Sequence, residues 1–586
     1  MRNLKVAATF LLVQQKIMTN QELAQVFNHI AEILDIQGEN PFKVRAYKKA
    51  VQTLENLTVQ LSTVEDFDKL GKLPGIGDAI NKKIRELLET GNLKYYEELK
   101  KSEYAPLVEF LKIPGVGPKH ARLIYDNLGI NNVTDLENAA KKGKLRGLFG
   151  LGEKTEENIL KGVTQVRKYK ERFPLAFIYP KALSLVDELK KNKEVEKITL
   201  AGSLRRMKET IADVDILVSS KNPESISDTF VKLPQVESVI AKGKTKTSIL
   251  TRDGFQSDLR IVKPDEFGAA QHYFTGSKAH NIRIRSLGLQ KKLKVNEYGV
   301  FKGKKRIAGK NEQEVFKSVG LPYIAPELRE DWGEIEMAQK KNLPHLVELK
   351  DIKGDLHVHS DWSDGNNSIQ EMAKEAKKRG YRYIAICDHT TAVGITGGLD
   401  EKRLVKQIDL IEKINKNLKN FTVLSGIEVD IKSNGKLDLP DEILKELDLV
   451  VAAVHTKFSQ TEEEMTQRII KAIENPVVDI IAHPTGRLIG KREPYHVDLD
   501  KIIDCCKANN KFLELNAYPE RLDLNDINCR KAKEKGVKIA ISTDAHNTRH
   551  LLWMTFGIST AKRGWLEPED VINTLTLNQL KKLLKR

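Results

Sequence analysis

Seven short apolar runs between residues 354 and 586 constrain the fold more than any other feature of this sequence. They alternate with charged stretches of helical periodicity, and six of the seven have His, Asp or Glu near the carboxyl end. The runs are GDLHVHS, RYIAICDHT, TVLSGIEVD, LVVAAVHT, VDIIAHPTG, FLELNA and VKIAISTDAH. Because a parallel βα barrel builds its site from the carboxyl ends of its strands, the pattern predicts a βα barrel with a polar site at one end.

The polar residues at the ends of these runs are typical metal ligands. A His-x-His pair such as His357 and His359 directs both imidazoles to one face of a strand. Imidazole and carboxylate sets suit Zn²⁺, Mn²⁺ or Fe. The candidate ligands are His357, His359, Asp364, His389, Glu428, His455, His483, Asp544 and His546. A lone histidine would usually be structural, but this many groups at strand ends predict a metal site.

Residues 354–586 resemble the PHP (polymerase and histidinol phosphatase) family, whose distorted seven-fold barrel holds three metal ions. The resemblance implies three ligand sets: His357, His359, Glu428 and Asp544; Glu428, His455 and His483; and Asp364, His389 and His546. All nine positions are filled, so we expect a metal-dependent phosphoesterase that hydrolyses phosphodiesters. Arg487, after HPTG, is either a phosphate ligand or a surface residue at the barrel rim.

A second set of carboxylates belongs to the stretch LAGSLRRMKETIADVDILV, residues 200–218. Asp213 and Asp215 are two residues apart in an apolar run, and a β-strand points both carboxylates to one face. An isolated pair of this kind is most simply a solvated edge strand. The hairpin TSILTRDGFQSDLRIV, however, places Asp258 on a strand as well. Three carboxylates are the number that a two-metal nucleotidyl-transfer site needs, and Mg²⁺ or Mn²⁺ takes such oxygens.

An internal repeat occupies the N-terminal part of the chain. KLPGIGDAINKKIRELL and KIPGVGPKHARLIY share an apolar-Pro-Gly-x-Gly turn before a basic amphipathic helix, and LFGLGEKTEENIL is a weaker third copy. The paired glycines let the backbone turn tightly and present N–H groups to a phosphate. One such turn could simply connect two helices. Two copies in a basic region resemble helix-hairpin-helix modules, which bind the DNA backbone without reading base sequence.

Charge and cysteine usage support this division. Lys+Arg 97 against Asp+Glu 81 gives a net charge of +16, and nearly all of the excess lies before residue 351. A basic N-terminal part favours a polyanionic partner such as nucleic acid. The four cysteines form no paired framework, which favours a reducing compartment, and no apolar run reaches the length of a membrane span. We therefore expect a cytoplasmic, nucleoid-associated protein with no membrane partner.

From about Met18 onward, the chain resembles the bacterial and archaeal type of family X DNA polymerase with a C-terminal PHP domain. The resemblance rests on the paired PGxG hairpins, on GS…DxD, on YFTGS at 273–277 and on VNEYGVF at 295–301. It implies a DNA-directed DNA polymerase that fills short gaps in base excision repair, with 3′–5′ exonuclease activity and abasic-site incision in the PHP domain. The expected partners are dNTPs and gapped or nicked DNA with a 5′-phosphate. The expected cofactors are two Mg²⁺ or Mn²⁺ ions in the palm and three Mn²⁺, Zn²⁺ or Fe ions in the PHP domain, and we expect a monomer.

The resemblance also assigns roles to individual residues. Asp213, Asp215 and Asp258 correspond to the ligands of the catalytic metals. Nucleotide binding is assigned to Gly202, Ser203, Arg206, Tyr273, Phe274, Gly276 and Asn281. DNA binding is assigned to Lys43, Tyr47, Gly75, Gly77, Gly115, Gly117 and Arg285. Lys83 matches the lysine that forms a Schiff base with an abasic deoxyribose phosphate, although it could equally be a solvated helix lysine.

Some positions depart from the pattern of the DNA polymerase beta group. Ala212 replaces a glycine before the first aspartate, Ile211 a serine near the triphosphate, Ala79 a basic residue and Gln256 an arginine. Arg260 resembles the arginine that restrains the aspartates. These departures bear on nucleotide affinity and on the lyase assignment more than on the type of reaction.

We therefore expect a multidomain α+β and α/β protein. The segments are an extension (1–17, with Met18 as an alternative start and a Thr19/Glu22 capping box after it), a lyase-like helical domain (18–92), fingers (93–172), a nucleotidyltransferase palm (173–264), a thumb (265–327), a linker (328–353) and a distorted (β/α)7 PHP barrel (354–586). Two alternatives remain open. One is a nucleotidyltransferase that acts on RNA or a small molecule, and the other is a DNA-end scaffold whose PHP metals are structural.

Overall fold

The computed structural model describes residues 20–55, 75–113, 116–148, 150–168, 172–391, 397–489 and 492–584. The chain divides into two compact units, Met1–Glu171 and Arg172–Arg586. The expected extension 1–17, Met18, Thr19 and Gly115 lie outside the described residues. Among those that are described, no helix is both long and apolar enough to cross a membrane.

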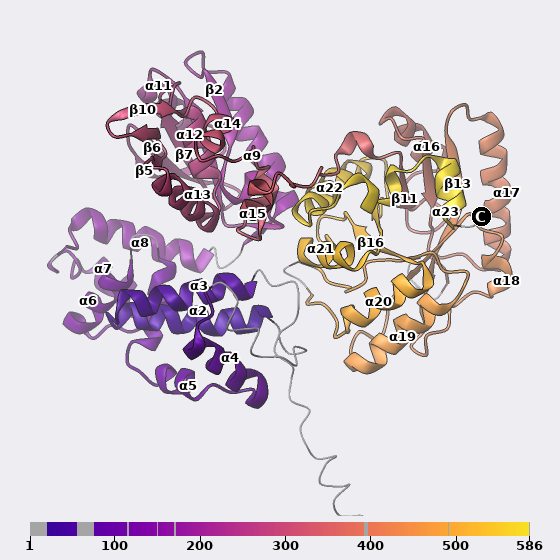
Figure 1. Ribbon diagram of the computed structural model, residues 1–586, viewed down its shortest axis with the longest axis horizontal. Coiled ribbons are helices and arrows are strands. Elements are labelled where there is room, and N and C mark those ends of the chain that lie inside the picture. Colours follow the sequence, from indigo (N-terminus) through magenta and orange to yellow (C-terminus); the bar gives the residue numbers. More distant parts are fainter. Residues whose placement is uncertain are drawn as a thin grey trace, which may run out of the picture. The chain divides into compact units, whose positions relative to one another are not determined.

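The first unit is built from helices (Figure 1). They are α2 (Asn20–Ile36), α3 (Pro41–Glu55), α4 (Asp78–Thr90), α5 (Lys94–Lys100), the 3₁₀ helix η3 (Ala105–Lys112), α6 (Pro118–Leu128), α7 (Val133–Lys141) and α8 (Glu153–Lys168). The two predicted hairpin helices are α4 and α6, and each starts directly after a glycine in extended conformation. Helix α4 buries Ile80, Ile84 and Leu87 on one face, so its basic residues lie on the other faces.

The expected palm segment, residues 173–264, contains a five-stranded sheet of order β2-β4-β7-β6-β5. The strands are β2 (Lys197–Leu200), β4 (Asp213–Ser219), β5 (Val236–Lys242), β6 (Lys246–Thr251) and β7 (Gln256–Val262). Strands β4 and β7 are parallel, while β6 and β7 form the predicted antiparallel hairpin. The other elements are β1 (Phe173–Pro174), α9 (Leu175–Lys190), α10 (Gly202–Arg205), β3 (Thr210–Ile211) and α11 (Pro223–Val231).

The thumb and the segment after it form one hydrophobic cluster. The thumb elements are α12 (Phe267–Thr275), α13 (Lys278–Gln290), β8 (Lys294–Asn296), β9 (Gly299–Lys302), β10 (Lys305–Ala308) and α14 (Glu312–Ser318). The expected linker contains η4 (Pro326–Leu328), α15 (Glu334–Gln339) and η5 (Leu349–Asp351). Its Ile335, Ala338 and Leu346 pack with Phe316 of α14 and Trp565 of the PHP region. The linker is therefore an ordered, buried connection.

All seven predicted strands of the C-terminal region form, and they pair in chain order as one parallel sheet. They are β11 (Gly354–Val358), β12 (Tyr383–Ile386), β13 (Thr422–Asp430), β14 (Leu449–Ala453), β15 (Ile480–Ile481), β16 (Phe512–Asn516) and β17 (Ile539–Ser542). A parallel bridge between Val358 and Ala545 joins the first strand to the end of the last, so the barrel is nearly closed. Consecutive residues of a strand point to opposite faces of the sheet. Tyr383 and Ile384, for example, belong to different hydrophobic clusters.

Helices surround these strands (Figure 1). They are α16 (Ile369–Lys378), α17 (Glu401–Asn417), α18 (Asp441–Leu444), α19 (Glu462–Glu474), α20 (Leu499–Asn509), α21 (Asp526–Lys535), η6 (His550–Trp553), α22 (Met554–Arg563), η7 (Pro568–Asp570), η8 (Ile572–Thr574) and α23 (Leu577–Leu584). Leu580 and Leu584 of α23 join the cluster of Leu356, Ala385 and Val451. Helix α23 therefore covers the barrel interior at the end remote from the polar strand ends.

Candidate active sites

The three predicted carboxylates of the palm lie on two adjacent strands. Asp213 and Asp215 are on β4 and share a half-buried face, while Val214 between them is fully buried. Asp258 of β7 is the register partner of Asp215. Burial, with the charges of Asp213 and Asp258, raises the pKa of Asp215 to about 7. Such crowding of carboxylates fits a site for divalent cations, whose charge would remove the repulsion.

Two neighbours that the sequence reading did not place in the site hold Asp258. Lys246 of β6 forms an ion pair with it, with Nζ 2.6 Å from Oδ2, and Gln256 Nε2 donates a hydrogen bond of 2.9 Å to Oδ1. Burial opposes ionisation, but the hydrogen bonds from Lys246 and Gln256 outweigh it and lower the pKa of Asp258. Gln256 thus orients the carboxylate of Asp258, which gives a physical role to one of the departures from the family pattern.

Helix α10, which follows β2, begins with Gly202 beside Asp215. Gly202 has φ of 60°, and a Cβ atom on it would lie 2.3 Å from Oδ2 of Asp215. Both facts require glycine. Ile211 is fully buried in the palm core, so it does not line a nucleotide site, whereas Ala212 is exposed.

Arg206 is engaged by protein groups. Its Nε donates to Glu330 Oε1 at 2.9 Å and its Nη1 to the Thr275 carbonyl oxygen at 2.5 Å. Glu330 belongs to the segment that the sequence reading took as a linker. The arginine predicted to bind the triphosphate is therefore held at the junction of palm, thumb and linker.

The YFTGS residues lie at the end of α12 and the start of α13. The Asn281 side chain donates a hydrogen bond of 2.7 Å to the Tyr273 carbonyl oxygen. The guanidinium group of Arg260 lies 4.8 Å from the centre of the Phe274 ring, so Arg260 stands between this ring and the carboxylates of β4 and β7. Gly276 has φ of 69°, and Arg285 is exposed on α13.

The nine predicted PHP ligands converge at the carboxyl ends of the barrel strands. Donor atoms of eight of them form three groups, each within 4.8 Å: His359, Asp364, His389 and His546; His357, His359 and Asp544; and His389, Glu428 and His455. These groups overlap with the sets that the resemblance implies but are not identical to them. His359 and His389 each belong to two groups, Glu428 is absent from the group of His357, and His483 belongs to none of the three. His483 and Asp544 have left-handed φ angles of 29° and 53°, a backbone strain typical of functional positions.

Glu428 at the end of β13 lies between the groups. Its Oε1 is 3.2 Å from His455 Nε2 and 3.0 Å from His483 Nε2, whereas its Oε2 is 3.4 Å from His357 Nε2. The two oxygens of one carboxylate therefore face two histidine sets. A bridging carboxylate of this kind suits a multinuclear site.

Carboxylates behind the ligands orient the imidazole rings. Glu514 Oε1 lies 2.8 Å from His357 Nδ1 and Asp430 Oδ1 lies 3.2 Å from His455 Nδ1, so that Nε2 of each ring is directed at Glu428. The sequence reading missed Glu514 and Asp430. The signal was present, because each is an acidic residue in an apolar strand.

The donor set of the barrel fits bound metal ions. Within the described residues, the buried Nδ1 of His359 has no hydrogen-bond partner, and it lies 3.8 Å from Asp364 Oδ1. A buried imidazole nitrogen without a partner is costly unless a metal ion takes its lone pair. Burial lowers the pKa of His455, but Glu428 and Asp430 outweigh it and raise that pKa to about 9. Protons thus balance carboxylate charge that metal ions would otherwise balance.

Arg487 takes neither of its two predicted roles. It lies partly exposed in the loop after His483 and forms an ion pair with Glu209 of the palm, with Nη2 2.7 Å from Oε2. It also donates a 2.6 Å hydrogen bond to the Leu522 carbonyl oxygen. Arg487 is therefore a contact between barrel and palm.

In the first unit, Lys43 and Tyr47, assigned to DNA binding, and Lys83, assigned to the Schiff base, lie around Tyr95 of α5. Nζ of Lys83 is 4.7 Å and Nζ of Lys43 is 5.8 Å from the centre of the Tyr95 ring, and the Tyr47 ring stacks on it at 6.4 Å. Lys43 also pairs with Glu39. The sequence reading missed Tyr95, which follows the first hairpin and carries no motif of its own.

The hairpin glycines are placed as expected where they are described. Gly75 has φ of 89°, which favours glycine, and a Cβ atom there would collide with the Lys49 side chain. Gly77 and Gly117 directly precede α4 and α6, and an added Cβ atom on either would meet open space. Within the part of the chain that the structure describes, no side chain therefore packs against these two glycines.

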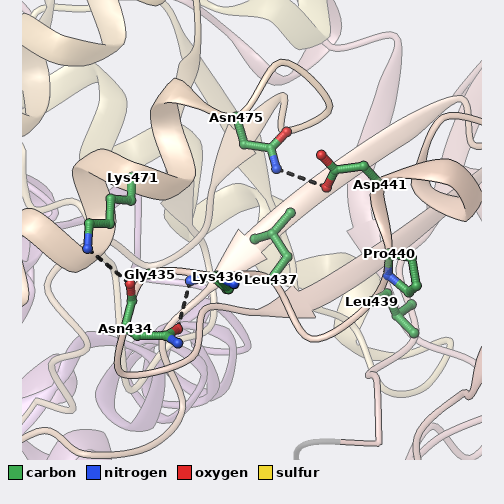
Figure 2. Close-up of a pocket in the computed structure, with 9 residues that line it drawn as sticks. All are labelled: Asn434, Gly435, Lys436, Leu437, Leu439, Pro440, Asp441, Lys471 and Asn475. Carbon is green, nitrogen blue, oxygen red and sulfur yellow. Dashed lines mark hydrogen bonds between the residues drawn. The ribbon is translucent and has the colours of Figure 1, made fainter.

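A pocket of about 530 Å³ lies between the segment after β13 and the end of α19 (Figure 2). Its lining residues are Asn434, Gly435, Lys436, Leu437, Leu439, Pro440, Asp441, Lys471 and Asn475. Lys471 and Asn475 make hydrogen bonds to the Asn434 carbonyl oxygen and to Asp441, so the polar groups of the pocket bond to one another. None of the predicted site residues lines it.

Four family models match separate parts of the chain. They are a helix-hairpin-helix domain (residues 18–93), a SAM-like helix-hairpin-helix tandem (107–163), a DNA polymerase beta thumb (270–330) and a PHP domain (355–518). A probable phosphatase of Thermoanaerobacter sp. strain X514 is 32% identical over 247 residues, which cover 39% of this chain and 94% of that protein. A probable phosphatase of Acetivibrio thermocellus is 33% identical over 202 residues, 33% of this chain and 78% of that protein.

One relative matches across nearly the whole chain. The DNA polymerase/3′-5′ exonuclease PolX of Bacillus subtilis (strain 168) is 38% identical over 573 residues, which cover 97% of this chain and all of that protein. The match includes the palm, the thumb and the barrel, whose carboxylate and histidine sets are described above. This chain belongs to the family X DNA polymerases that carry a C-terminal PHP domain.

Proposed function

We propose that this chain is a DNA-directed DNA polymerase that fills short gaps in base excision repair, and that its PHP domain removes nucleotides from 3′ ends. The observation that carries the proposal is the presence of two separate ligand sets in one chain. Three aspartates lie on β4 and β7, and eight of the nine candidate ligands of the barrel lie in three clusters. The name of the Bacillus subtilis relative joins the same two activities.

In the palm, Asp213, Asp215 and Asp258 would hold two Mg²⁺ or Mn²⁺ ions. Such ions, when bound, lower the pKa of a primer 3′-hydroxyl and neutralise the triphosphate. Gly202 leaves room for the Asp215 carboxylate, and Lys246 and Gln256 fix that of Asp258. The protein's own contribution is therefore to hold the ligands in place before substrate binds.

The nucleotide would lie between the palm carboxylates and the end of α12. Gly202, Ser203 and Arg206 would contact the triphosphate of a dNTP. Tyr273, Phe274 and Gly276 would face its sugar, and Asn281 its base. The bond from Asn281 to the Tyr273 carbonyl oxygen holds the start of α13 against the end of α12, which supports this placement.

In the barrel, the nine ligands would hold three Mn²⁺, Zn²⁺ or Fe ions, which supply Lewis acidity for phosphodiester hydrolysis. Glu514 and Asp430 set the ring orientation of His357 and His455. The same chemistry suits incision at abasic sites. Arg487 is excluded as a phosphate ligand in this conformation, because Glu209 engages it.

The helical unit would bind the DNA. Lys43, Tyr47 and Lys83 around Tyr95 would receive the 5′-phosphate of a gap, and Gly75, Gly77, Gly115 and Gly117 would approach the backbone. The exposed Arg285 would contact the template.

Lys83 is also the proposed lyase nucleophile. Borohydride should trap the protein on a 5′-deoxyribose phosphate. Loss of this trapping in Lys83→Ala, with trapping kept in Lys82→Ala, would support that role.

We propose a monomer that works on the nucleoid in the cytoplasm.

The decisive experiment uses a gapped duplex with a 5′-phosphate and a labelled primer, in Mn²⁺, with and without dNTPs. The expected result is extension with dNTPs and shortening without them. Asp258→Asn should lower extension by roughly 10³-fold and keep shortening. His357→Ala should do the reverse.

Other outcomes contradict parts of the proposal. Loss of both activities in either variant would argue against two independent sites. A preference for ribonucleotides would favour a nucleotidyltransferase of another class. Metal-loaded protein that hydrolyses no 3′ end would favour a DNA-end scaffold with structural metals, and metal-stripped protein that still hydrolyses would contradict the nuclease assignment.

A further inference from the structure

A buried arginine of the PHP domain contacts the residue assigned to the triphosphate. Arg563 ends helix α22, and its side chain is 3% exposed. Its Nη1 lies 3.0 Å from Glu330 Oε1, and it donates a 2.9 Å hydrogen bond to the Arg206 carbonyl oxygen. Its Nη2 pairs with Asp526 at 2.7 Å. The barrel thus contacts the backbone of the proposed nucleotide site.

Glu330 joins the two arginines through one oxygen. Oε1 of Glu330 accepts from Arg206 Nε at 2.9 Å and from Arg563 Nη1 at 3.0 Å. The second bond of Arg206, to the Thr275 carbonyl oxygen, fixes the plane of its guanidinium group. Nε and Nη1 are both engaged, so Nη2 is the nitrogen left to take a phosphate oxygen.

The charges around Glu330 are unequal. Burial opposes its ionisation, but Arg563, Lys208 and Arg206 outweigh burial and lower the pKa of Glu330 to about 2. One carboxylate therefore faces three cations. Without Arg563, Arg206 would be the one remaining close partner of Glu330, with Lys208 Nζ at 4.0 Å, and an incoming triphosphate would have to compete with the Glu330 carboxylate for Arg206.

Other contacts fix α22 and the barrel against the palm. Phe556 of α22 packs edge-on against Tyr179 of α9, with ring centres 6.2 Å apart. Arg487 of the barrel pairs with Glu209, three residues after Arg206. The segment from Arg206 to Glu209 is therefore held by two arginines of the PHP domain, one at each end.

We infer that Arg563 is a positioning residue for nucleotide binding: by sharing Glu330 with Arg206, it orients Arg206 and preserves the positive charge that the triphosphate meets. Through this residue the PHP domain contributes to dNTP affinity at the palm. The inference rests on the proposed polymerase function. It assigns to the PHP domain a role in synthesis that its own metal site does not supply.

The test measures kcat and KM for dNTPs in full-length protein on the gapped duplex. Arg563→Met should raise KM about tenfold, the effect of weakening one charged hydrogen bond to phosphate, with a smaller change in kcat. Arg563→Met combined with Glu330→Gln should restore KM to within about threefold of wild type, because the neutral side chain no longer competes for Arg206. A purely structural role predicts no such rescue.

Matched controls separate this effect from damage to the fold. Arg530→Met removes another arginine of the same contact region, which donates to the Trp332 carbonyl oxygen and lies over the Trp565 ring, and it should leave KM unchanged. Each variant should keep 3′–5′ hydrolysis of single-stranded DNA and its unfolding temperature. If Arg563→Met does not fold, the single variant Glu330→Gln tests the inference. A KM for dNTPs in Glu330→Gln at or below the wild-type value supports it.

Two results would overturn the inference. One is an unchanged KM in folded Arg563→Met, and the other is a tenfold higher KM in Glu330→Gln. A wild-type protein that does not extend the primer at all would instead refute the proposed function. The two failures are therefore distinguishable.

Discussion

Asp215 of β4 and Asp258 of β7 are direct register partners on parallel strands, so their carboxylates occupy neighbouring positions on one face of the palm sheet. Asp213 adds a third carboxylate on the same face of β4. Burial and the charges of these two neighbours raise the pKa of Asp215 to about 7. The sheet register alone thus creates a site that attracts divalent cations.

Gly202→Ala should disable the palm. The added Cβ atom would lie 2.3 Å from Oδ2 of Asp215, at a φ of 60°. We expect a loss of primer extension of roughly 10²-fold, because a displaced ligand misplaces the reacting groups. Steady-state extension assays will measure the loss. Gly303→Ala is the control, since Gly303 has φ of 59° and no atom within 4 Å of its added Cβ atom. Equal losses in both variants would show that backbone strain, and not the contact with Asp215, is responsible.

Glu514→Gln should weaken metal binding in the barrel only. The carboxylate of Glu514 lies 2.8 Å from His357 Nδ1 and orients that ring. Loss of such a partner typically lowers metal affinity by about 10- to 100-fold. Titration of metal-stripped protein with Mn²⁺, read out by hydrolysis of single-stranded DNA, measures the shift, and primer extension should be unaffected. The exposed Glu446→Gln serves as control, and an unchanged Mn²⁺ dependence in Glu514→Gln would refute the orienting role.

Glu312→Gln should destabilise the palm–thumb contact in a pH-dependent way. Glu312 pairs with Arg205 and Arg329 at 2.6 Å each, and these pairs outweigh burial and lower its pKa to about 2. A depressed pKa gives stabilisation that is complete above about pH 4.5 and is lost as pH falls toward 2.

The difference between wild type and Glu312→Gln should therefore be largest near neutral pH, up to about 3 kcal/mol, and should shrink below about pH 4.5. Scanning calorimetry at several pH values measures it as a difference in unfolding temperature. Glu194→Gln, at an exposed position of the palm, should show almost no effect at any pH. A difference that grows as pH falls would contradict the assignment.

Tyr95→Ala should reduce recognition of the 5′-phosphate. The Tyr95 ring contacts Tyr47 and lies within 5.8 Å of the Nζ atoms of Lys43 and Lys83. Its removal should lower the affinity for gapped DNA with a 5′-phosphate by about tenfold, and the affinity for the same duplex with a 5′-hydroxyl much less. Fluorescence anisotropy with both duplexes measures the ratio, and equal losses on the two would count against a phosphate pocket at Tyr95.

Much of the fold was predictable because its pattern is local. The seven apolar runs became the seven barrel strands, and the hairpin around the Asp253-Gly254 turn became β6 and β7. The clustering of the candidate ligands was predictable for the same reason. The alternation of apolar residues and the polar residues at strand ends indicate which side chains are buried and which share a face. These patterns do not depend on the rest of the chain.

Residues whose role depends on a distant partner were missed or placed differently. Glu514 acts through His357, which is 157 residues away in the sequence. Tyr95 lies beside Lys43 and Tyr47 of α3, and only the packing of α5 near α3 brings these residues together. Arg487 was interpreted without a partner, but it forms an ion pair with Glu209. The segment 328–353 was interpreted as a linker, but its Ile335 packs in the hydrophobic cluster of the thumb.

The sequence by itself determined the chemistry of this protein, since residue types and spacings select carboxylates for the palm and histidines for the barrel. Tertiary structure alone decided how the parts of its second unit contact one another. Arg206, Glu330 and Arg563 are separated by more than a hundred residues at each step, and they share one hydrogen-bond network because the chain folds α22 against the end of the thumb. Such pairings depend on long-range packing, which no local pattern encodes.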